Sequence, residues 1–228
     1  MMMNAKRLAL KIHARLLKFY GEPTWRNPLP PLDELVSTIL SQNTNDANRD
    51  RAFKSLRKQF ASWESVRDAG TEAVVAAIRP AGLGNQKGPR IQQVLRQITG
   101  ERGLLDLSFL KELPLEEARG WLMKFKGVGP KTAAIVLLFS LGRPAFPVDT
   151  HIYRVTGRLG LRPERMTVEE AHPFLEGLFP PETYYAVHLN IIRLGREICA
   201  ARRPDCPACP LRDICPVGVD KLATLMVK

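Results

Sequence analysis

The sequence predicts an all-α fold, on three observations. Apolar residues recur three and four positions apart in most segments, as in 32–40. No segment alternates apolar and polar residues as a half-buried strand would. Glycine, proline and capping residues separate the periodic segments, so short loops are expected between helices. The 228 residues, 45% of them hydrophobic, suffice for one large or two small domains.

Helical spacing continues along the whole chain. After a stiff proline connector at 28–31, it predicts helices at 32–40, 53–60, 74–78, 91–98, 115–125, 131–141, 149–159, 167–178 and 187–198. Thr71 is expected to cap one of them and Gly100 to end another. Thr167 and Glu170 have the spacing of a capping box. The helix at 131–141 is apolar nearly all round, so it should be buried.

The charge of the chain favours an anionic partner. Lysine and arginine number 34 against 23 acidic residues, which gives a formal net charge of +11. Nucleic acid is the first candidate for an excess of this size. No secretory signal is visible, and no apolar run is long enough to span a bilayer. The apolar face of the N-terminal segment is therefore expected to pack on the body of the protein, through Leu8, Ile12, Leu16 and Phe19.

A glycine-rich turn is the most informative stretch, with the sequence Lys126-Gly127-Val128-Gly129-Pro130-Lys131. The glycines permit a tight turn, and proline suits a first helical turn. Unpaired N–H groups at the positive end of a helix can bind a phosphate. An ammonium is less favoured at this end, so Lys131 could supply a partly neutral amine that acts as a nucleophile. Taken alone, such a turn is more often a plain connection, and such a lysine a solvated charge.

All four cysteines follow the spacing C-x6-C-x2-C-x5-C, at Cys199, Cys206, Cys209 and Cys215. In a cytosolic protein this clustering indicates a metal site rather than disulfides. Spacing alone leaves open both a zinc site with four cysteine ligands and an iron–sulfur cluster. Zinc ribbons usually have two C-x2-C knuckles, whereas this chain has one.

Three segments together resemble the endonuclease III family of helix-hairpin-helix DNA glycosylases. They are the turn and its flank at 126–133, the segment 148–155 with the sequence VDTHIYRV, and the cysteine spacing. The resemblance covers about 31–216. It implies two helical lobes that flank a DNA-binding cleft. One is a six-helix bundle with the helix-hairpin-helix motif, at 24–142, and the other combines 1–23 with 143–228 and binds a 4Fe-4S cluster through the four cysteines.

The resemblance also implies which residues perform the chemistry. Lys131 would attack C1′ of the damaged nucleotide, displace the base and form a Schiff base. Asp149 would stabilise positive charge on the sugar or help to deprotonate the lysine. Asp149 also suits the N-cap of the helix that it opens, and one carboxylate can serve both roles. The backbone N–H groups of Gly127, Val128 and Gly129 would bind phosphate without reading sequence.

Two loops are expected to fill the gap in the duplex, because a glycosylase must take its target nucleotide out of the base stack. The family places these residues where this chain has Asn43 and Leu83. Most family members carry a longer glutamine at the first position, and here Gln42 stands one residue earlier. Leu83 has the alternative of an ordinary loop residue. His151 is expected near the cleft or the DNA backbone, with a buried structural histidine as the alternative.

The resemblance therefore implies an enzyme that removes oxidised pyrimidines from double-stranded DNA and cleaves abasic sites by β-elimination, and we expect it to be monomeric and cytoplasmic. A monofunctional adenine or thymine mismatch glycosylase is one alternative. Lys131 argues against it, as does the short tail after Cys215, where no further domain is expected. A DNA-binding module without catalysis is the other alternative, and the presence of both Lys131 and Asp149 argues against it.

Overall fold

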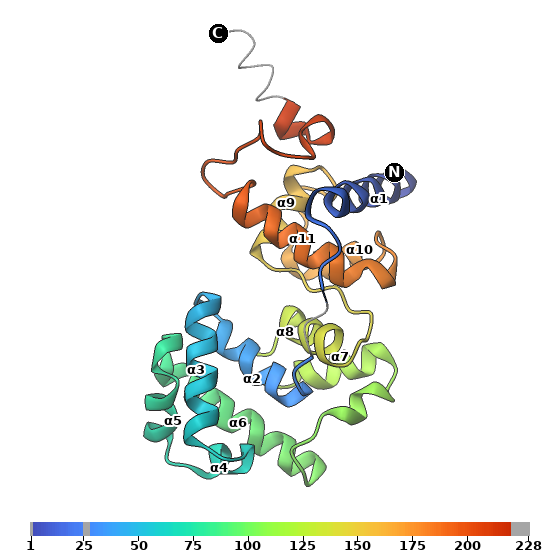
Figure 1. Ribbon diagram of the computed structural model, residues 1–228. Coiled ribbons are helices and arrows are strands. Elements are labelled where there is room, and N and C mark those ends of the chain that lie inside the picture. Colours follow the sequence, from blue (N-terminus) through green and yellow to red (C-terminus); the bar gives the residue numbers. More distant parts are fainter. Residues whose placement is uncertain (1, 25–27, 220–228) are drawn as a thin grey trace. The chain divides into compact units, whose positions relative to one another are not determined.

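The computed structural model describes residues 2–24 and 28–219, and it confirms the all-helical prediction for them. Figure 1 shows helices joined by loops, with no strand in this part of the chain. Contacts divide the chain into two compact units, 27–143 and a second formed by 1–26 with 144–228. The division into two functional lobes, one at 24–142 and the other at 1–23 with 143–228, stays a prediction. None of the described helices combines the length and the apolar character that a membrane crossing needs.

The unit at 27–143 is built around α2, Pro31–Ser41. This helix packs against α3, α6 and α8, and its predicted apolar stripe from Leu32 to Leu40 is buried, as expected for a core-facing helix. The helices of the unit are α2, α3 (Asp46–Gln59), α4 (Trp63–Asp68), α5 (Thr71–Ala77), α6 (Gly84–Arg102), α7 (Leu115–Met123) and α8 (Pro130–Ile135). Short helical turns lie at η1 (Arg79–Ala81), η2 (Ser108–Lys111) and η3 (Val136–Ser140), where the last continues α8 as a π-helix.

Two predicted helix ends in this unit are wrong. Gly70 is the N-cap of α5, and the hydroxyl of Thr71 instead donates to Oε1 of Gln92 at 2.8 Å. Gly100 lies inside α6, which continues to Arg102 and ends at Gly103, with φ +75°. Both errors have one cause: several residues near a helix end can cap it, and tertiary packing selects among them.

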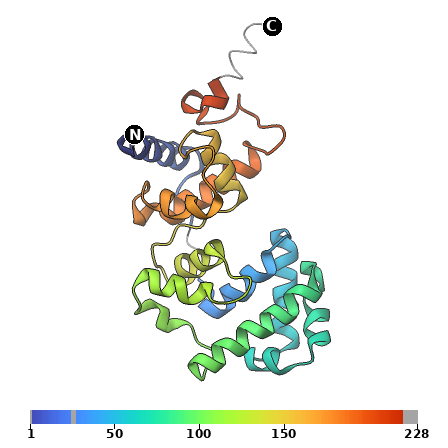
Figure 2. The same ribbon diagram turned by 180° about the vertical axis from the view of Figure 1, so that it is seen from behind.

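The second unit surrounds α11, Tyr184–Glu197, which packs against α9 (Thr150–Arg158) and α1 (Met2–Tyr20). Figure 2 shows the same helices from behind. Its other helical segments are α10 (Val168–Glu176), η4 (Pro181–Thr183) and η5 (Arg212–Ile214). The Thr167–Glu170 capping box at the start of α10 is confirmed. Among the side chains of α1 that the structure describes, Ala9, Ile12 and Leu16 are buried, whereas Phe19 is 51% exposed, so the predicted face is wrong in the last turn.

Candidate active site and cysteine cluster

The glycine-rich turn joins α7 to α8 and leaves backbone donors free. Gly127 has φ +84°, and Gly129 is the N-cap of α8. No backbone carbonyl among the described residues accepts the N–H of Gly127, Gly129 or Lys131. The N–H of Val128, in contrast, donates to Phe125 at 3.0 Å, and the Val128 side chain is buried. The turn is thus anchored through Val128 and presents N–H donors on both sides of it.

Lys131 lies in the first turn of α8 with its side chain exposed. The three residues after it, Thr132, Ala133 and Ala134, are buried and fix the helix on the unit. The amine has no hydrogen-bond or ion-pair partner within the described ranges. This arrangement holds the lysine backbone firmly and leaves its amine available for a reaction.

The turn is supported from the side by α2 and α6. Nε2 of Gln42 donates to the carbonyl of Gly127 at 2.9 Å, and Nη1 of Arg90 donates to Oε1 of Gln42 at 2.9 Å. A Cβ at position 127 would lie 2.5 Å from Cδ of Arg90, so a side chain here would displace the end of Arg90 as well as strain the backbone at its positive φ. Gln42 is therefore engaged in supporting the turn, while its neighbour Asn43 is exposed.

Asn43 and Leu83 share an uncommon backbone conformation. Their φ angles are +53° and +52°, and they are the non-glycine residues of the described chain with positive φ. Positive φ costs free energy for such residues, most of all for leucine, and strain of this kind gathers at functional sites. Leu83 is also 46% exposed. The structure therefore gives both of these loop residues the same two features, exposure and a strained backbone.

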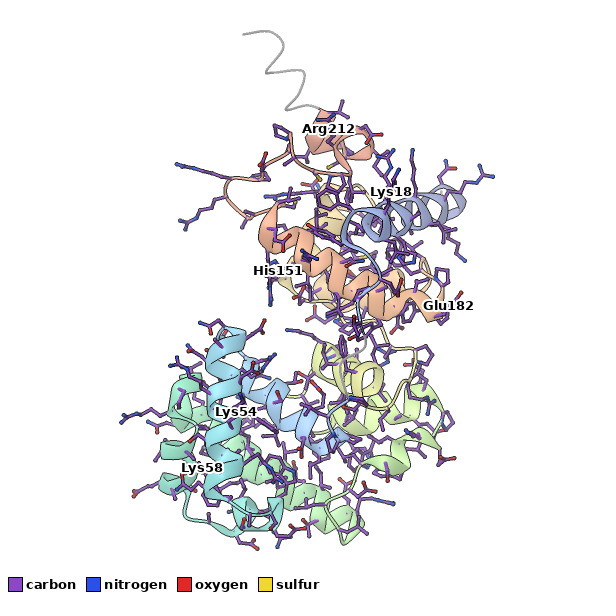
Figure 3. The ribbon with its side chains drawn as sticks, viewed as in Figure 1. Lys18, Lys54, Lys58, His151, Glu182 and Arg212 are labelled. Atoms are coloured by element: carbon purple, nitrogen blue, oxygen red, sulfur yellow. The ribbon has the colours of Figure 1, made fainter. Side chains whose placement is uncertain are left out.

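Asp149 belongs to the other unit, at the start of α9. Its Oδ1 accepts the N–H of Ile152 at 2.7 Å, which confirms the predicted N-cap. His151 follows on the same helix (Figure 3) and is half-buried, with Nδ1 3.1 Å from Nη2 of Arg154. A Cβ at Gly195 of α11 would lie 3.0 Å from Nδ1 of His151, so the imidazole lies close against that helix.

The four cysteines line one pocket, together with Arg158 and Arg212. Cys206 is buried and the other three are half-buried. Burial raises the pKa of the Cys209 thiol to about 11 and also raises the pKa of Cys215. Within the described residues, no three His, Cys, Asp or Glu side chains converge as a single metal ion requires. Four thiols around a shared pocket are a donor set that suits either tetrahedral zinc or an iron–sulfur cluster.

Two arginines of α9 hold the cysteine loop. Arg158 donates to Sγ of Cys199 at 3.3 Å and to the carbonyls of Ala200 and Ala201 at 2.7 Å each. Arg154 donates to the carbonyl of Cys199 at 3.2 Å. The sequence analysis missed both roles, as it missed Arg90. An arginine on an amphipathic helix is usually a solvated charge, and only the fold shows which carbonyls it meets.

Residues 36–181 match the HhH-GPD superfamily of base excision DNA repair proteins. The chain belongs to this superfamily. It is 34% identical over 185 residues to endonuclease III of Thermotoga maritima, a match that covers 81% of this chain and 82% of that protein. It is 38% identical over 169 residues to an Arabidopsis thaliana putative DNA glycosylase, At3g47830, covering 74% of this chain but only 57% of the relative. In rice protein ROS1C the matched part is 10% of the length.

Solved structures agree with this assignment. An endonuclease III–DNA covalent intermediate superposes with a TM-score of 0.81 at 28% identity, covering 95% of this chain and 98% of that one. A thermostable thymine-DNA glycosylase superposes at 0.77 with 21% identity, which shows the shared fold alone. The chain is thus an endonuclease III-like member of the DNA glycosylases. Its four C-terminal cysteines fit the iron–sulfur motif of that family.

Proposed function

We propose that this chain is a DNA glycosylase with AP lyase activity, which removes oxidised pyrimidines from double-stranded DNA and cuts the strand at the resulting abasic site. The observation that carries the proposal is Lys131, an exposed amine without a partner in the described chain, beside a turn with free N–H donors. The likeness to an endonuclease III trapped covalently on DNA supports it. So does the similarity to a plant DNA glycosylase/AP lyase, ROS1, at 32% identity.

Lys131 acts as the nucleophile. Its neutral amine attacks C1′ of the flipped nucleotide, the glycosidic bond breaks, and the base leaves with a proton. Opening of the sugar ring gives a Schiff base between Nζ and C1′. Loss of the C2′ proton then expels the 3′ phosphate by β-elimination, and water releases the cut sugar from the lysine. Covalent catalysis of this kind divides one difficult step into two easier ones.

Asp149 assists this chemistry with its carboxylate. It stabilises the positive charge that develops on the sugar, or accepts the proton that Lys131 loses before attack. The N-cap bond from the Ile152 N–H ends on Oδ1, so the carboxylate keeps further lone pairs for a second role.

Duplex binding uses backbone donors and two loop residues. The N–H groups of Gly127 and Gly129 bind a phosphate of the DNA backbone, which positions the duplex without reading its sequence. Asn43 and Leu83 enter the space left by the flipped nucleotide. His151 contributes from α9 near the backbone. The net charge of +11 supports a polyanionic partner such as duplex DNA.

The four cysteines would hold a 4Fe-4S cluster as thiolates. The donor set fits such a cluster, since all four line one pocket. The cluster would have a structural role, in which it fixes the loop that carries the cysteines, rather than a redox role. Arg202 and Arg203, both exposed in that loop, would then face the phosphate backbone of the DNA.

A cleavage assay tests the function. The purified chain is incubated with duplexes that contain thymine glycol, an abasic site, or an A·G or T·G mismatch, and the products are resolved with and without alkali. The proposal expects strand breaks at thymine glycol and at the abasic site without alkali. Breaks at thymine glycol or at a mismatch that need alkali would indicate base removal alone. An abasic duplex that stays intact without alkali, together with thymine glycol and mismatch duplexes that stay intact with and without alkali, would refute an enzymatic role.

A further inference from the structure

Lys87 is one of the largest fully buried side chains in the described chain, with 1% of its surface exposed. Its Nζ donates to the carbonyl of Leu40 at 2.8 Å and to that of Ala81 at 2.9 Å. Burial, together with the nearby charge of Arg90, lowers the pKa of this ammonium. Burying an ammonium costs free energy unless strong hydrogen bonds compensate for the lost hydration. The role of Lys87 is therefore to be found in the two segments whose carbonyls it bonds.

The two carbonyls end the segments that lead into the loops of Asn43 and Leu83. Leu40 lies in the last turn of α2, and Ala81 ends η1. The other carbonyls at the end of α2 have local donors: Ser41 Oγ for Thr38, Gln42 N for Ile39, and Thr44 N for Ser41. The carbonyl of Leu40 is bonded by Lys87, whose charge also suits the negative end of the helix dipole.

Lys87 contacts the second loop through its backbone as well. Its N–H donates to the carbonyl of Leu83 at 2.9 Å, in the first turn of α6. One residue therefore bonds both loops at once. Asn43 and Leu83 are the non-glycine residues of the described chain with positive φ, so both loops hold a strained conformation that needs support from outside.

Arg90, one turn further along α6, extends the same face. It donates to Gln42, whose amide donates to the carbonyl of Gly127 in the glycine-rich turn. The side chain of Arg90 also lies directly against Gly127. Lys87 and Arg90 together thus connect α6 to all three loops of this unit that the proposed function assigns to DNA.

We propose that Lys87 is a positioning residue for opening the duplex: its ammonium fixes the loops of Asn43 and Leu83 so that both side chains can enter the base stack together. This inference rests on the proposed function. It predicts that loss of the ammonium impairs extrusion of a paired nucleotide far more than the later chemistry on a nucleotide that is already unpaired.

The test compares two substrates for each variant. Single-turnover cleavage is measured with thymine glycol in a fully paired duplex, and with the same lesion inside a bubble of unpaired bases. Lys87→Met keeps the length of the side chain and removes its donors and charge. We expect its rate on the duplex to fall by about tenfold to a hundredfold, and its rate on the bubble to stay within about threefold.

The ratio of the two rates is the deciding quantity, because partial unfolding lowers both rates by the same factor. Lys87→Gln retains an amide donor on a shorter side chain, and its ratio should lie between those of wild type and Lys87→Met. It provides the answer if Lys87→Met does not fold. Lys58→Met is the control, because it makes the same change in the last turn of α3. Lys58 and Lys54 of this helix are labelled in Figure 3, and the control should keep the wild-type ratio.

Equal losses on duplex and bubble in the Lys87 variants would contradict the positioning role while leaving the proposed function intact. An unchanged rate on both substrates would contradict it as well. A wild-type chain that cleaves neither substrate would contradict the proposed function, and the role of Lys87 with it.

Discussion

Single polar side chains in this molecule stabilise the segments that the proposed function uses. Asp149 caps α9 through Ile152, and Gln42 supports the turn at Gly127. A substitution to alanine at either position would therefore mix a loss of stability with a loss of function. Isosteric changes that keep the structural hydrogen bond separate the two effects.

Asp149→Asn is the sharpest change of this kind. Asparagine is as good an N-cap as aspartate, so the free energy of unfolding should change by less than about 0.5 kcal/mol. The charge is lost, so single-turnover cleavage should fall by about a hundredfold or more. Denaturant unfolding and a cleavage time course check the two halves. Full activity with unchanged stability would leave Asp149 with its cap alone.

Three supporting residues could not be found from the sequence, and the physical reason is the same for each. Lys87, Arg90 and Arg158 all donate to groups far away in the sequence. No periodicity or motif marks which backbone carbonyl a long side chain will reach. Lys131 and the cysteines, in contrast, lie in motifs whose spacing is itself informative, and their roles stay predictions.

At the level of elements, the glycine-rich turn shows two glycines with different constraints. Gly127 has φ +84° and Arg90 fills the space where a Cβ would lie. Gly129 has φ −96°, and nothing lies within 4 Å of a Cβ there. The sequence suggested the same conformational freedom for both, and only the packing distinguishes them.

Alanine substitutions at the two positions should therefore differ. Gly127→Ala should lower the free energy of unfolding by at least about 1–2 kcal/mol, because it adds a left-handed penalty to a steric clash. Gly129→Ala serves as its matched control and should stay within about 0.5 kcal/mol. Denaturant titration measures both. Equal effects would mean that the turn has a different conformation in solution.

Helix positions were predictable because the apolar spacing of each segment matches a buried stripe, as in α2. Helix ends were less predictable from the sequence. Asp149 and Thr167 cap as expected, but Thr71 and Gly100 do not, since Gly70 and Gly103 fill those places. Exposed Phe19 on α1 has a similar explanation, because helical spacing cannot show where the surface that a helix packs on comes to an end.

At the level of the whole molecule, the cysteine loop connects distant parts of one unit. Arg15 of α1 pairs with Asp213, and Arg158 of α9 bonds the segment at 199–201. The guanidinium of Arg15 lowers the pKa of Asp213 to about 2. A bound cluster would therefore stabilise α1 and α9 as well as the loop that carries its ligands.

Cys206→Ala, which removes the most buried ligand, tests this connection. The purified variant should lose iron and visible absorption. Hydrogen exchange should rise at 199–218 and in the neighbouring turns of α1 and α9, while α2 and α6 of the other unit keep their protection. Wild-type protein prepared in parallel is the control. Zinc in place of iron, or unchanged exchange around the cysteines, would contradict a stabilising iron–sulfur cluster.

The central claim is that Lys131 is the nucleophile, and chemical trapping tests this claim most directly. Borohydride reduces a Schiff base to a stable secondary amine, so the chain is incubated with an abasic duplex and borohydride, and the cross-linked peptide is sequenced by mass spectrometry. We expect the DNA on Lys131, no adduct with Lys131→Gln, and a wild-type yield with Lys124→Gln, which changes another exposed lysine. An adduct on a different lysine, or one that persists in Lys131→Gln, would contradict the mechanism.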